Sequence, residues 1–287
     1  MSYRNSVLRA VRELRNMPHP HQDLVSLLQD GNADIDEVCR ALTFDPGLTA
    51  VILAAANKTL RPGEAGIYSL RAAVQRLGPE KLAAQVLSAS IRPLVEAHPL
   101  RYFQGKDDVF WKHSVVLALC AEELASETGV VAPTDAFTAA LLADVGKLAT
   151  DQGIDYDGLK ALRTARKEAM LADAERELFD IDHAEASALL LKSWGLPESM
   201  LHAIRYHHRP DDCPAASQAL ADVIQVAQFL CCQLGEDLGF DSCTCHVANS
   251  SVERLHCSQE TLELIQYRVC GYFDEVMAAF LIRPRAA

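Results

Sequence analysis

Apolar residues recur at helical spacing along almost the whole sequence, and no convincing run alternates in the manner of a β-strand. The clearest helix starts at Asp45 and Pro46, an N-cap residue followed by proline at the first helical position. The sequence therefore predicts an all-α protein. Helices are expected at 23–28, 35–42, 46–57, 70–77, 79–87, 111–126, 135–148, 186–194, 198–208, 217–234 and 258–282, and an irregular segment at 235–251.

The stretch from His98 to Asp108 is the best candidate boundary within the chain, because it holds a His-Pro pair and a polar run after Gly105. Predicted helices before it are short, and those after it are longer. We therefore expect a two-lobed multi-helix bundle, with an N-terminal lobe of short helices at 1–105 and a C-terminal helical lobe at 106–287.

Composition limits the class of protein. The chain has 49% hydrophobic and 23% charged residues, which is ordinary for a soluble globular protein with a core. A net charge of −12 disfavours general nucleic-acid binding, which needs a cationic surface. No apolar run reaches the roughly 18–20 residues that span a bilayer, and no secretory signal opens the chain. The nine cysteines are scattered and odd in number, so a cytoplasmic location is expected.

The segment from Ala140 to Lys147 reads as an apolar helical turn that ends in one carboxylate, Asp144. A histidine directly before it would give two adjacent metal ligands, but Ala143 stands there. If the apolar surface beside it is buried, Asp144 needs a partner. His113 and Lys147 are both candidates, and Lys147 is alternatively able to bind an anion.

Histidines and a second aspartate further along the chain complete a candidate ligand set of imidazoles and carboxylates, which suits Fe, Mn, Zn or Ni. His183 in a first helical turn gains nothing from the helix dipole when charged, which favours a neutral, ligating role. His207 and His208 close a helix, where interaction with the dipole explains them equally well. Asp222 shares its side of a helix with glutamines, so an exposed polar stripe explains it as well as coordination does.

A second candidate metal site is the cluster Cys243, Cys245 and His246 in the expected irregular segment. Structural zinc needs a second ligand pair, which His256 and Cys257 would supply, but the spacing of the first three residues is atypical. Free loop cysteines remain the alternative. The sequence contains no glycine-rich phosphate loop and no Gly-x-Ser-x-Gly motif.

Taken together, these motifs resemble the HDOD domain family over about residues 10 to 230. The segment 44–57 resembles the family's DPxLxxxxLxxxN element, and 136–147 resembles its AFxxGLLHDIGK helix. The remaining matches, in the expected order, are Ile67–Gly78, Phe110–Ser114, Glu177, Asp182–Glu185, Trp194–Pro197 and His207–His208.

The resemblance implies a relation to HD-type metal phosphohydrolases and HD-GYP cyclic-dinucleotide phosphodiesterases, and a role in bacterial signalling. Ala143 departs from the family pattern where a histidine is expected, and Ala140 departs where the pattern has glycine. By position, remnant metal ligands would be His113, Asp144, His183, His207, His208 and Asp222, with Lys147 near a substrate phosphate and structural roles for Asp45, Asn57, Trp194 and Pro197.

The expected function is therefore a non-enzymatic regulatory module that binds a partner protein or a small ligand. Loss of the metal would remove the activated water that phosphoester hydrolysis requires. Two alternatives stay open: a metal-dependent phosphohydrolase or phosphodiesterase with an incomplete site, and a metal- or ligand-sensing module without catalysis. No cofactor beyond a divalent transition metal is implied, and a homo-oligomer is compatible with the sequence.

Overall fold

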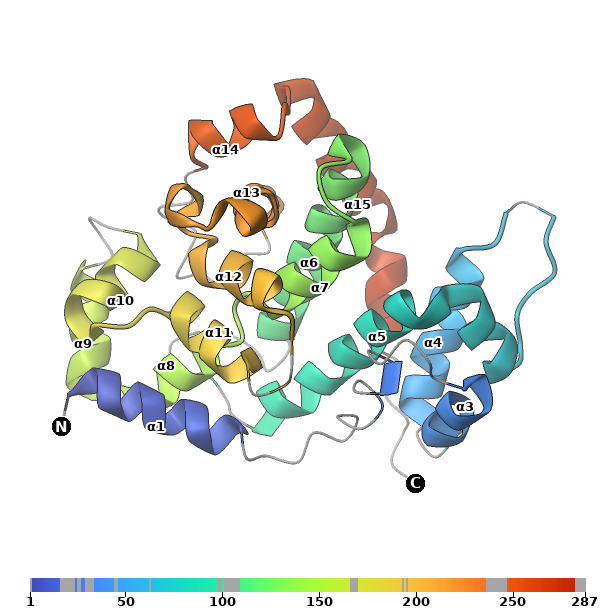
Figure 1. Cartoon of the computed structure of the whole chain (residues 1–287), viewed down its shortest axis with the longest axis horizontal. Helices are drawn as coiled ribbons and strands as arrows, with labels where there is room; N and C mark the ends of the chain where they lie inside the picture. The colour runs from blue at the N-terminus through green and yellow to red at the C-terminus, as the bar shows by residue number, and fades with distance from the viewer. Residues whose placement is uncertain are drawn as a thin grey trace. The chain divides into compact units, whose positions relative to one another are not determined.

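The computed structural model describes residues 2–15, 24, 27–28, 34–43, 46–61, 63–97, 100, 109–165, 170–192, 194, 196–235 and 247–281. Every regular element in these ranges is helical, which confirms the all-α prediction (Figure 1). The elements are α1 (Tyr3–Arg15), α3 (Ile35–Thr43), α4 (Pro46–Lys58), α5 (Leu70–Ala97), α6 (Val109–Thr128), α7 (Pro133–Leu142), α8 (Lys147–Gly153), α9 (Tyr156–Ala165), α10 (Leu171–Phe179), α11 (His183–Lys192), α12 (Glu198–Tyr206), the 3-10 helix η1 (Pro210–Asp212), α13 (Ala215–Gln233), α14 (Asn249–Arg254) and α15 (Gln259–Leu281).

Contacts between residues group the chain into two compact units. Unit 1 comprises residues 1–18 and 94–270, and unit 2 comprises 19–93 and 271–287. Helix α1 thus belongs with the later part of the chain, whereas the sequence-based division placed it in a lobe at 1–105. Grouping by contacts does not by itself define domains, so the boundary near residue 105 stays a prediction.

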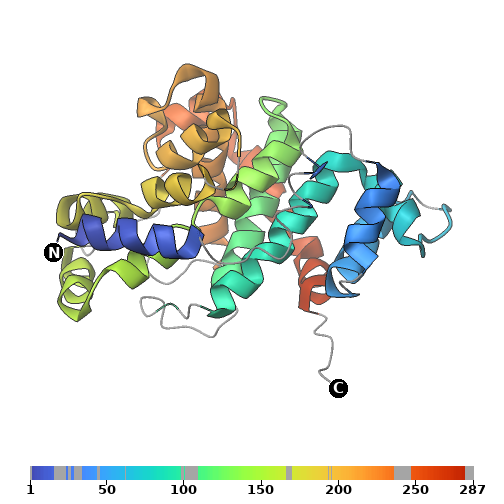
Figure 2. The same cartoon turned by 60° about the horizontal axis from the view of Figure 1, so that its bottom comes forward.

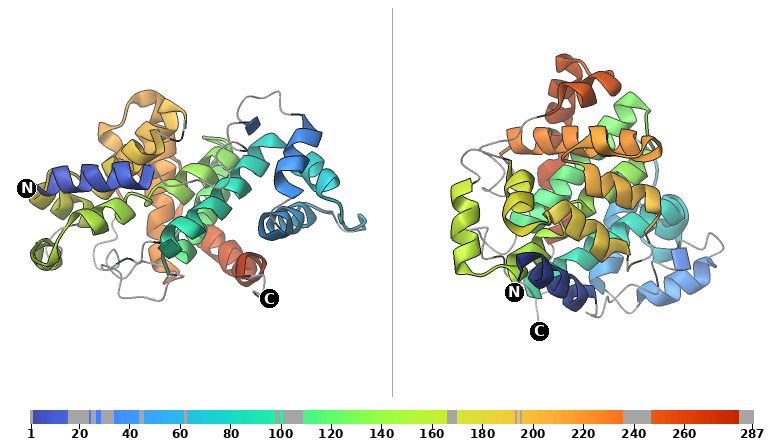
Figure 3. Two further views of the ribbon diagram at one scale, coloured as in Figure 1. Left: turned by 90° about the horizontal axis from the view of Figure 1, so that it is seen from below. Right: turned by 60° about the vertical axis from the view of Figure 1, so that its left-hand side comes forward.

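The core of unit 1 is built around α6, which packs against α7 and α13 (Figures 2 and 3). Helix α6 is buried on most sides, from Phe110 to Ala125, because its apolar residues are not confined to one stripe. Helices α11 and α12 pack against each other, and α12 also contacts α13. Helix α1 covers α8 and α11. This arrangement brings the loops at the ends of α7, α10 and α12 towards the start of α11.

Helix α13 is long and apolar enough to cross a membrane, by length and composition alone. The sequence analysis found no apolar run of that length. The most apolar window of α13 is 67% buried, and the helix contacts α6, α7, α12 and α14 within unit 1. A core helix of a globular protein has the same properties.

Several helix boundaries differ from those predicted. The single helix expected at 135–148 is interrupted by a turn at 143–146. Helix α14 starts at Asn249, inside the segment expected to be irregular, and α1, α8, α9 and α10 were not predicted. The break predicted at Gly78 is present, since this residue has a φ of 75° inside α5.

The cysteines of the described residues are mostly free thiols. Six form no disulfide: Cys39, Cys120, Cys213, Cys231, Cys257 and Cys270. Cys232 is disulfide-bonded, and its partner lies outside the described residues. The Cys243, Cys245 and His246 cluster also lies outside them, and so does Asp45.

In unit 2, Asn57 near the end of α4 fixes the loop that leads to α5. Its amide nitrogen donates to the carbonyl oxygens of Leu53 and Ile67, both at 2.8 Å. Its amide oxygen accepts a hydrogen bond from the backbone N–H of Ile67, also at 2.8 Å. Ser69 then caps α5 by accepting a hydrogen bond from Ala72 N–H at 3.1 Å.

We expect Asn57→Ala to lower the free energy of unfolding by about 1–3 kcal/mol, because it leaves part-buried backbone groups of the loop unsatisfied. The measurement is urea denaturation followed by circular dichroism. Asn5→Ala is the matched control, since Asn5 is exposed on α1. Equal midpoints for the two variants would contradict the role given to Asn57.

Candidate metal centre

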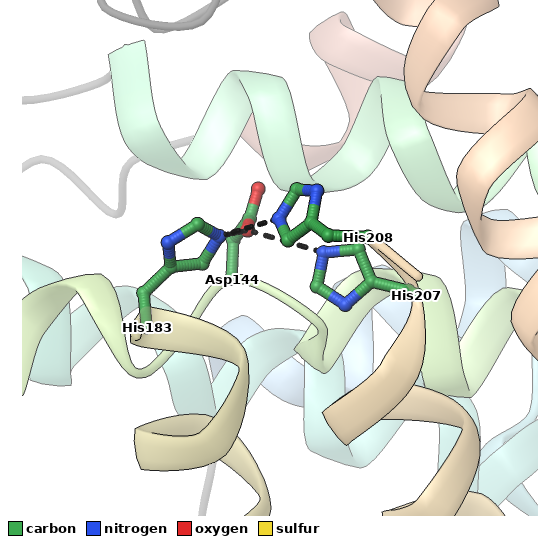
Figure 4. A group of neighbouring side chains, drawn as sticks. All are labelled: Asp144, His183, His207 and His208. Carbon is green, nitrogen blue, oxygen red and sulfur yellow. Dashed lines mark hydrogen bonds and ion pairs between the residues drawn. The ribbon is translucent and has the colours of Figure 1, made fainter. Parts of the chain in front are cut away.

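Asp144 lies in the turn between α7 and α8 and is almost fully buried. Short-range backbone hydrogen bonds form this turn: Val145 N–H donates to Leu142 C=O at 3.2 Å, and Lys147 N–H donates to Asp144 C=O at 2.9 Å. The turn directs the carboxylate away from the apolar face of α7, towards the histidines that follow in the sequence (Figure 4).

Ser187 on α11 holds this turn in place. Its hydroxyl oxygen accepts a hydrogen bond from Gly146 N–H at 2.7 Å and lies 2.6 Å from the carbonyl oxygen of Ala143, to which the hydroxyl donates. Gly146 is required at the contact, because a Cβ there would overlap the carbonyl oxygen of His183 and the backbone nitrogen of Ser187. This close approach of backbone to backbone places Asp144 opposite His183.

The two oxygens of the Asp144 carboxylate have different surroundings. Oδ2 accepts a hydrogen bond from His113 Nε2 at 2.8 Å and lies 3.1 Å from the Lys147 ammonium. Oδ1 lies 3.3 Å from His183 Nε2 and 4.0 Å from His207 Nε2. Both partners of Asp144 expected from the sequence, His113 and Lys147, are therefore present, and both bind the same oxygen.

Electrostatics keep this carboxylate ionised. Burial alone would raise the pKa of Asp144, but Lys147, His113 and His183 outweigh it and hold the pKa well below its ordinary value. Lys147 is itself buried. Its ammonium contacts Asp144 and is not exposed at the surface, where a phosphate would meet it.

His183, the first residue of α11, is completely buried. Its Nδ1 donates to Glu175 Oε2 at 2.6 Å, and its Nε2 lies 2.8 Å from His208 Nε2. Asp182 caps the helix by accepting a hydrogen bond from Glu185 N–H at 2.7 Å, as the sequence predicts. Burial lowers the pKa of His183, but Glu175 and Asp144 outweigh this effect and raise it to about 10. Without a metal this ring is therefore protonated at pH 7, contrary to the neutral form expected from the sequence, and a bound metal would displace the proton from Nε2.

His207 and His208 follow the last turn of α12. His207 Nδ1 donates to the carbonyl oxygen of Ile204 at 2.6 Å, so its Nε2 carries the lone pair that faces Asp144. Burial lowers the pKa of His207 to about 4 and that of His208 well below its ordinary value. Both imidazoles are therefore neutral at pH 7, which is the form that binds metals.

Four side chains thus converge, each with one ligand atom within 4.8 Å of the others: Asp144, His183, His207 and His208 (Figure 4). Two of these atoms, Asp144 Oδ1 and His207 Nε2, are buried and make no hydrogen bond of ordinary geometry among the described residues, and Oδ1 has only the ion pair with His183 at 3.3 Å. Buried polar atoms rarely remain unsatisfied, so the arrangement fits a cation at their centre. Three imidazoles and one carboxylate suit Zn, Fe or Mn.

The structure does not bring Asp222 into this group. Asp222 lies on α13 and is completely buried, with Arg254 bound to both carboxylate oxygens at 2.7 and 2.8 Å. Ser251 donates a third hydrogen bond at 2.6 Å. Ser251 and Arg254 both lie in α14, a helix that the sequence analysis did not predict. The exposed polar stripe proposed for Asp222 is therefore also wrong.

Sequence analysis missed one further residue of the centre, Glu175 on α10. The signal was present, because Leu171, Glu175 and Phe179 recur every four residues on one face of the helix, and all three are buried. A carboxylate in an apolar stripe indicates a buried partner.

Two of the four residues expected to have structural roles, Trp194 and Pro197, lie close in sequence to the histidines of the centre. Trp194 follows α11, with its backbone N–H bonded to the carbonyl oxygen of Leu191 at 2.9 Å. Pro197 is the N-cap residue of α12, and its carbonyl oxygen accepts the N–H groups of Met200 and Leu201. Pro197 therefore helps to begin the helix that carries His207.

We expect Gly146→Ala to lower the free energy of unfolding by about 1–3 kcal/mol, because the added methyl group forces the turn at 143–146 away from α11. Urea denaturation measures the change. Gly271→Ala is the control, since Gly271 is exposed on α15 with open space around it. A Gly146→Ala protein as stable as the control variant would contradict the close contact.

The HDOD domain family matches residues 14–210, more than half of the chain. A comparison with curated proteins found no match. An HDOD domain protein of unknown function from Geobacter sulfurreducens has a similar structure, with 25% identity and a TM-score of 0.69, and the match covers 96% of this chain and 97% of that chain.

Two structures from Shewanella amazonensis SB2B also share the fold. One, named "Putative phosphohydrolase", is 22% identical with a TM-score of 0.72, and the match covers 96% of this chain and 98% of that chain. The other, named "Putative metal-dependent phosphohydrolase", is 16% identical with a TM-score of 0.57, and the match covers 96% and 90%. Sequence identities this low show that the fold is shared and do not bear on activity. The family match and the motifs from 44 to 208 together show that this chain belongs to the HDOD domain family.

Proposed function

We propose that the protein is a non-catalytic HDOD signalling module that holds one divalent transition metal and binds a partner protein or small ligand. The observation that carries the metal is the pair of buried atoms without hydrogen-bond partners, Asp144 Oδ1 and His207 Nε2, in a group of four converging ligands. Zn, Fe, Mn and Ni all accept this ligand set. The metal would hold the ends of α7 and α12 against α11.

The number of protein ligands argues against hydrolysis. Four protein ligands form a closed site of the structural type, whereas a catalytic metal keeps one position open for water or substrate. A second metal beside Asp144 would lack donors, because Ala143 has none and Arg254 binds both oxygens of Asp222. Lys147 contacts Asp144 in the interior and is not placed at the surface for a phosphate.

The second candidate function is metal-dependent hydrolysis of a phosphoester. It is favoured by the names of the two Shewanella proteins and by His208, which is only partly buried and lies at the edge of the cluster. In this reading, His208 would move aside and leave a metal position for water. The metal would then activate this water for attack on the phosphorus atom.

Partner and location remain part of the proposal. The net charge of −12 disfavours a polyanionic partner such as nucleic acid and is compatible with a basic protein surface. The scattered, odd-numbered cysteines support a cytoplasmic location, whereas the disulfide of Cys232 argues against it. Self-association into a homo-oligomer would give such a module two partner sites.

We expect about one transition metal per chain in protein purified without chelator or affinity metal, measured by inductively coupled plasma mass spectrometry. His207→Ala should lose most of it, because the variant lacks one of the four ligand atoms, a buried imidazole nitrogen that has no hydrogen-bond partner among the described residues. His202→Ala is the matched control, since His202 lies on the same helix outside the cluster. A folded wild-type protein without metal would refute the metal-binding part.

We expect no turnover of nucleotides or cyclic dinucleotides when Mn, Fe or Ni is added, because the four protein ligands leave no open metal position. Product release measured by chromatography over a substrate panel checks this. Turnover that disappears in Asp144→Ala would refute the non-catalytic proposal and favour hydrolysis. Turnover that persists in Asp144→Ala would indicate a contaminating enzyme, and the protein would be repurified until this activity is gone.

A further inference from the structure

Glu175 on α10 is a buried carboxylate that makes two hydrogen bonds to a single residue. Its Oε2 accepts the backbone N–H of His183 at 2.8 Å and the ring Nδ1–H of the same residue at 2.6 Å. It is 2% exposed, and His183 is completely buried. The carboxylate therefore touches both the first backbone group of α11 and the imidazole that this helix carries.

The double contact determines which nitrogen of His183 faces the cluster. With Nδ1 bonded to Glu175, Nε2 points to Asp144 Oδ1 at 3.3 Å and to His208 Nε2 at 2.8 Å. Because Nδ1 keeps its proton for Glu175, Nε2 is the nitrogen that would give up its proton to a metal and bind it. A ring turned by 180° about its Cβ–Cγ bond would lose the bond to Glu175 and present a carbon atom to the cluster.

We propose that Glu175 is the positioning residue of the metal centre, which orients His183 so that Nε2 is the ligand atom. This inference rests on the proposed function, because it assigns Glu175 to a metal that the four ligands hold. Glu175 acts only through His183 and does not itself reach the metal. Carboxylate partners of ligating histidines generally fix the ring and increase its basicity.

The experiment measures zinc affinity by competition with a chromophoric chelator, in folded protein checked by circular dichroism. Glu175→Leu should bind zinc about 10–100-fold more weakly, the usual effect of losing such a partner. Glu175→Asp keeps the charge but withdraws it from the ring, and we expect about a 10-fold loss. Glu175→Gln keeps an acceptor oxygen in place, so its affinity should fall by only about threefold.

Glu177→Leu is the matched control on the same helix. Glu177 is exposed and does not belong to the cluster, so zinc affinity should not change. A second readout is the ¹⁵N spectrum of the zinc-loaded protein labelled at histidine. The Nδ1 proton of His183 should be protected from exchange with water in wild-type protein and in Glu175→Gln, and should exchange rapidly in Glu175→Asp.

The outcomes separate this inference from the proposed function. If the wild-type protein binds no zinc, both the proposed metal site and the role of Glu175 are overturned. If the wild-type protein binds zinc and Glu175→Leu binds it equally tightly, only the role of Glu175 is overturned. Equal losses in Glu175→Gln and Glu175→Leu also overturn it, because the hydrogen bond and not the charge is the basis of positioning. If Glu175→Leu does not fold, Glu175→Asp carries the same comparison.

Discussion

The buried charge of Asp144 is the constraint on which the centre depends. A carboxylate without water needs strong partners, and Lys147 and His113 supply them on one oxygen only. The other oxygen forms an ion pair with His183 at 3.3 Å and faces His207 at 4.0 Å. Helices α6, α7, α11 and α12 pack around this one group, so its electrostatic needs and their packing are satisfied together.

A comparison of the buried residues Asp144 and Asp222 shows that the counter-ion of a carboxylate determines whether it can also bind a metal. Arg254 and Ser251 saturate both oxygens of Asp222, and a planar guanidinium with two parallel hydrogen bonds leaves no room for a metal. The point charge of Lys147 leaves one oxygen of Asp144 open. Asp222 therefore connects α13 to α14, whereas Asp144 remains able to bind a cation.

The position that lacks a histidine still has a structural role. The carbonyl oxygen of Ala143 accepts a hydrogen bond from Ser187, and this bond helps to hold the turn at 143–146 against α11. Replacement of the side chain at 143 therefore removes a donor without loss of the turn that presents Asp144. The turn that presents Asp144 therefore does not need a histidine at position 143.

The sequence by itself determined the helical class, the family and the break at Gly78. Periodic apolar residues and caps act over a few residues, so they can be recognised without knowledge of the fold. The turn at 143–146 was not predicted, because its apolar pattern continues the helix and only the contact with Ser187 interrupts it.

The tertiary structure decided which ligands meet. The sequence named His113, Asp222 and the three later histidines as candidates but could not show which of them meet, because spacing between separate helices does not define a distance. Packing then placed His183, His207 and His208 around Asp144, directed Asp222 to Arg254 and brought Glu175 behind His183. Helix ends far apart in sequence converge only when the core between them is packed, and this is why the centre could be listed from the sequence but not assembled from it.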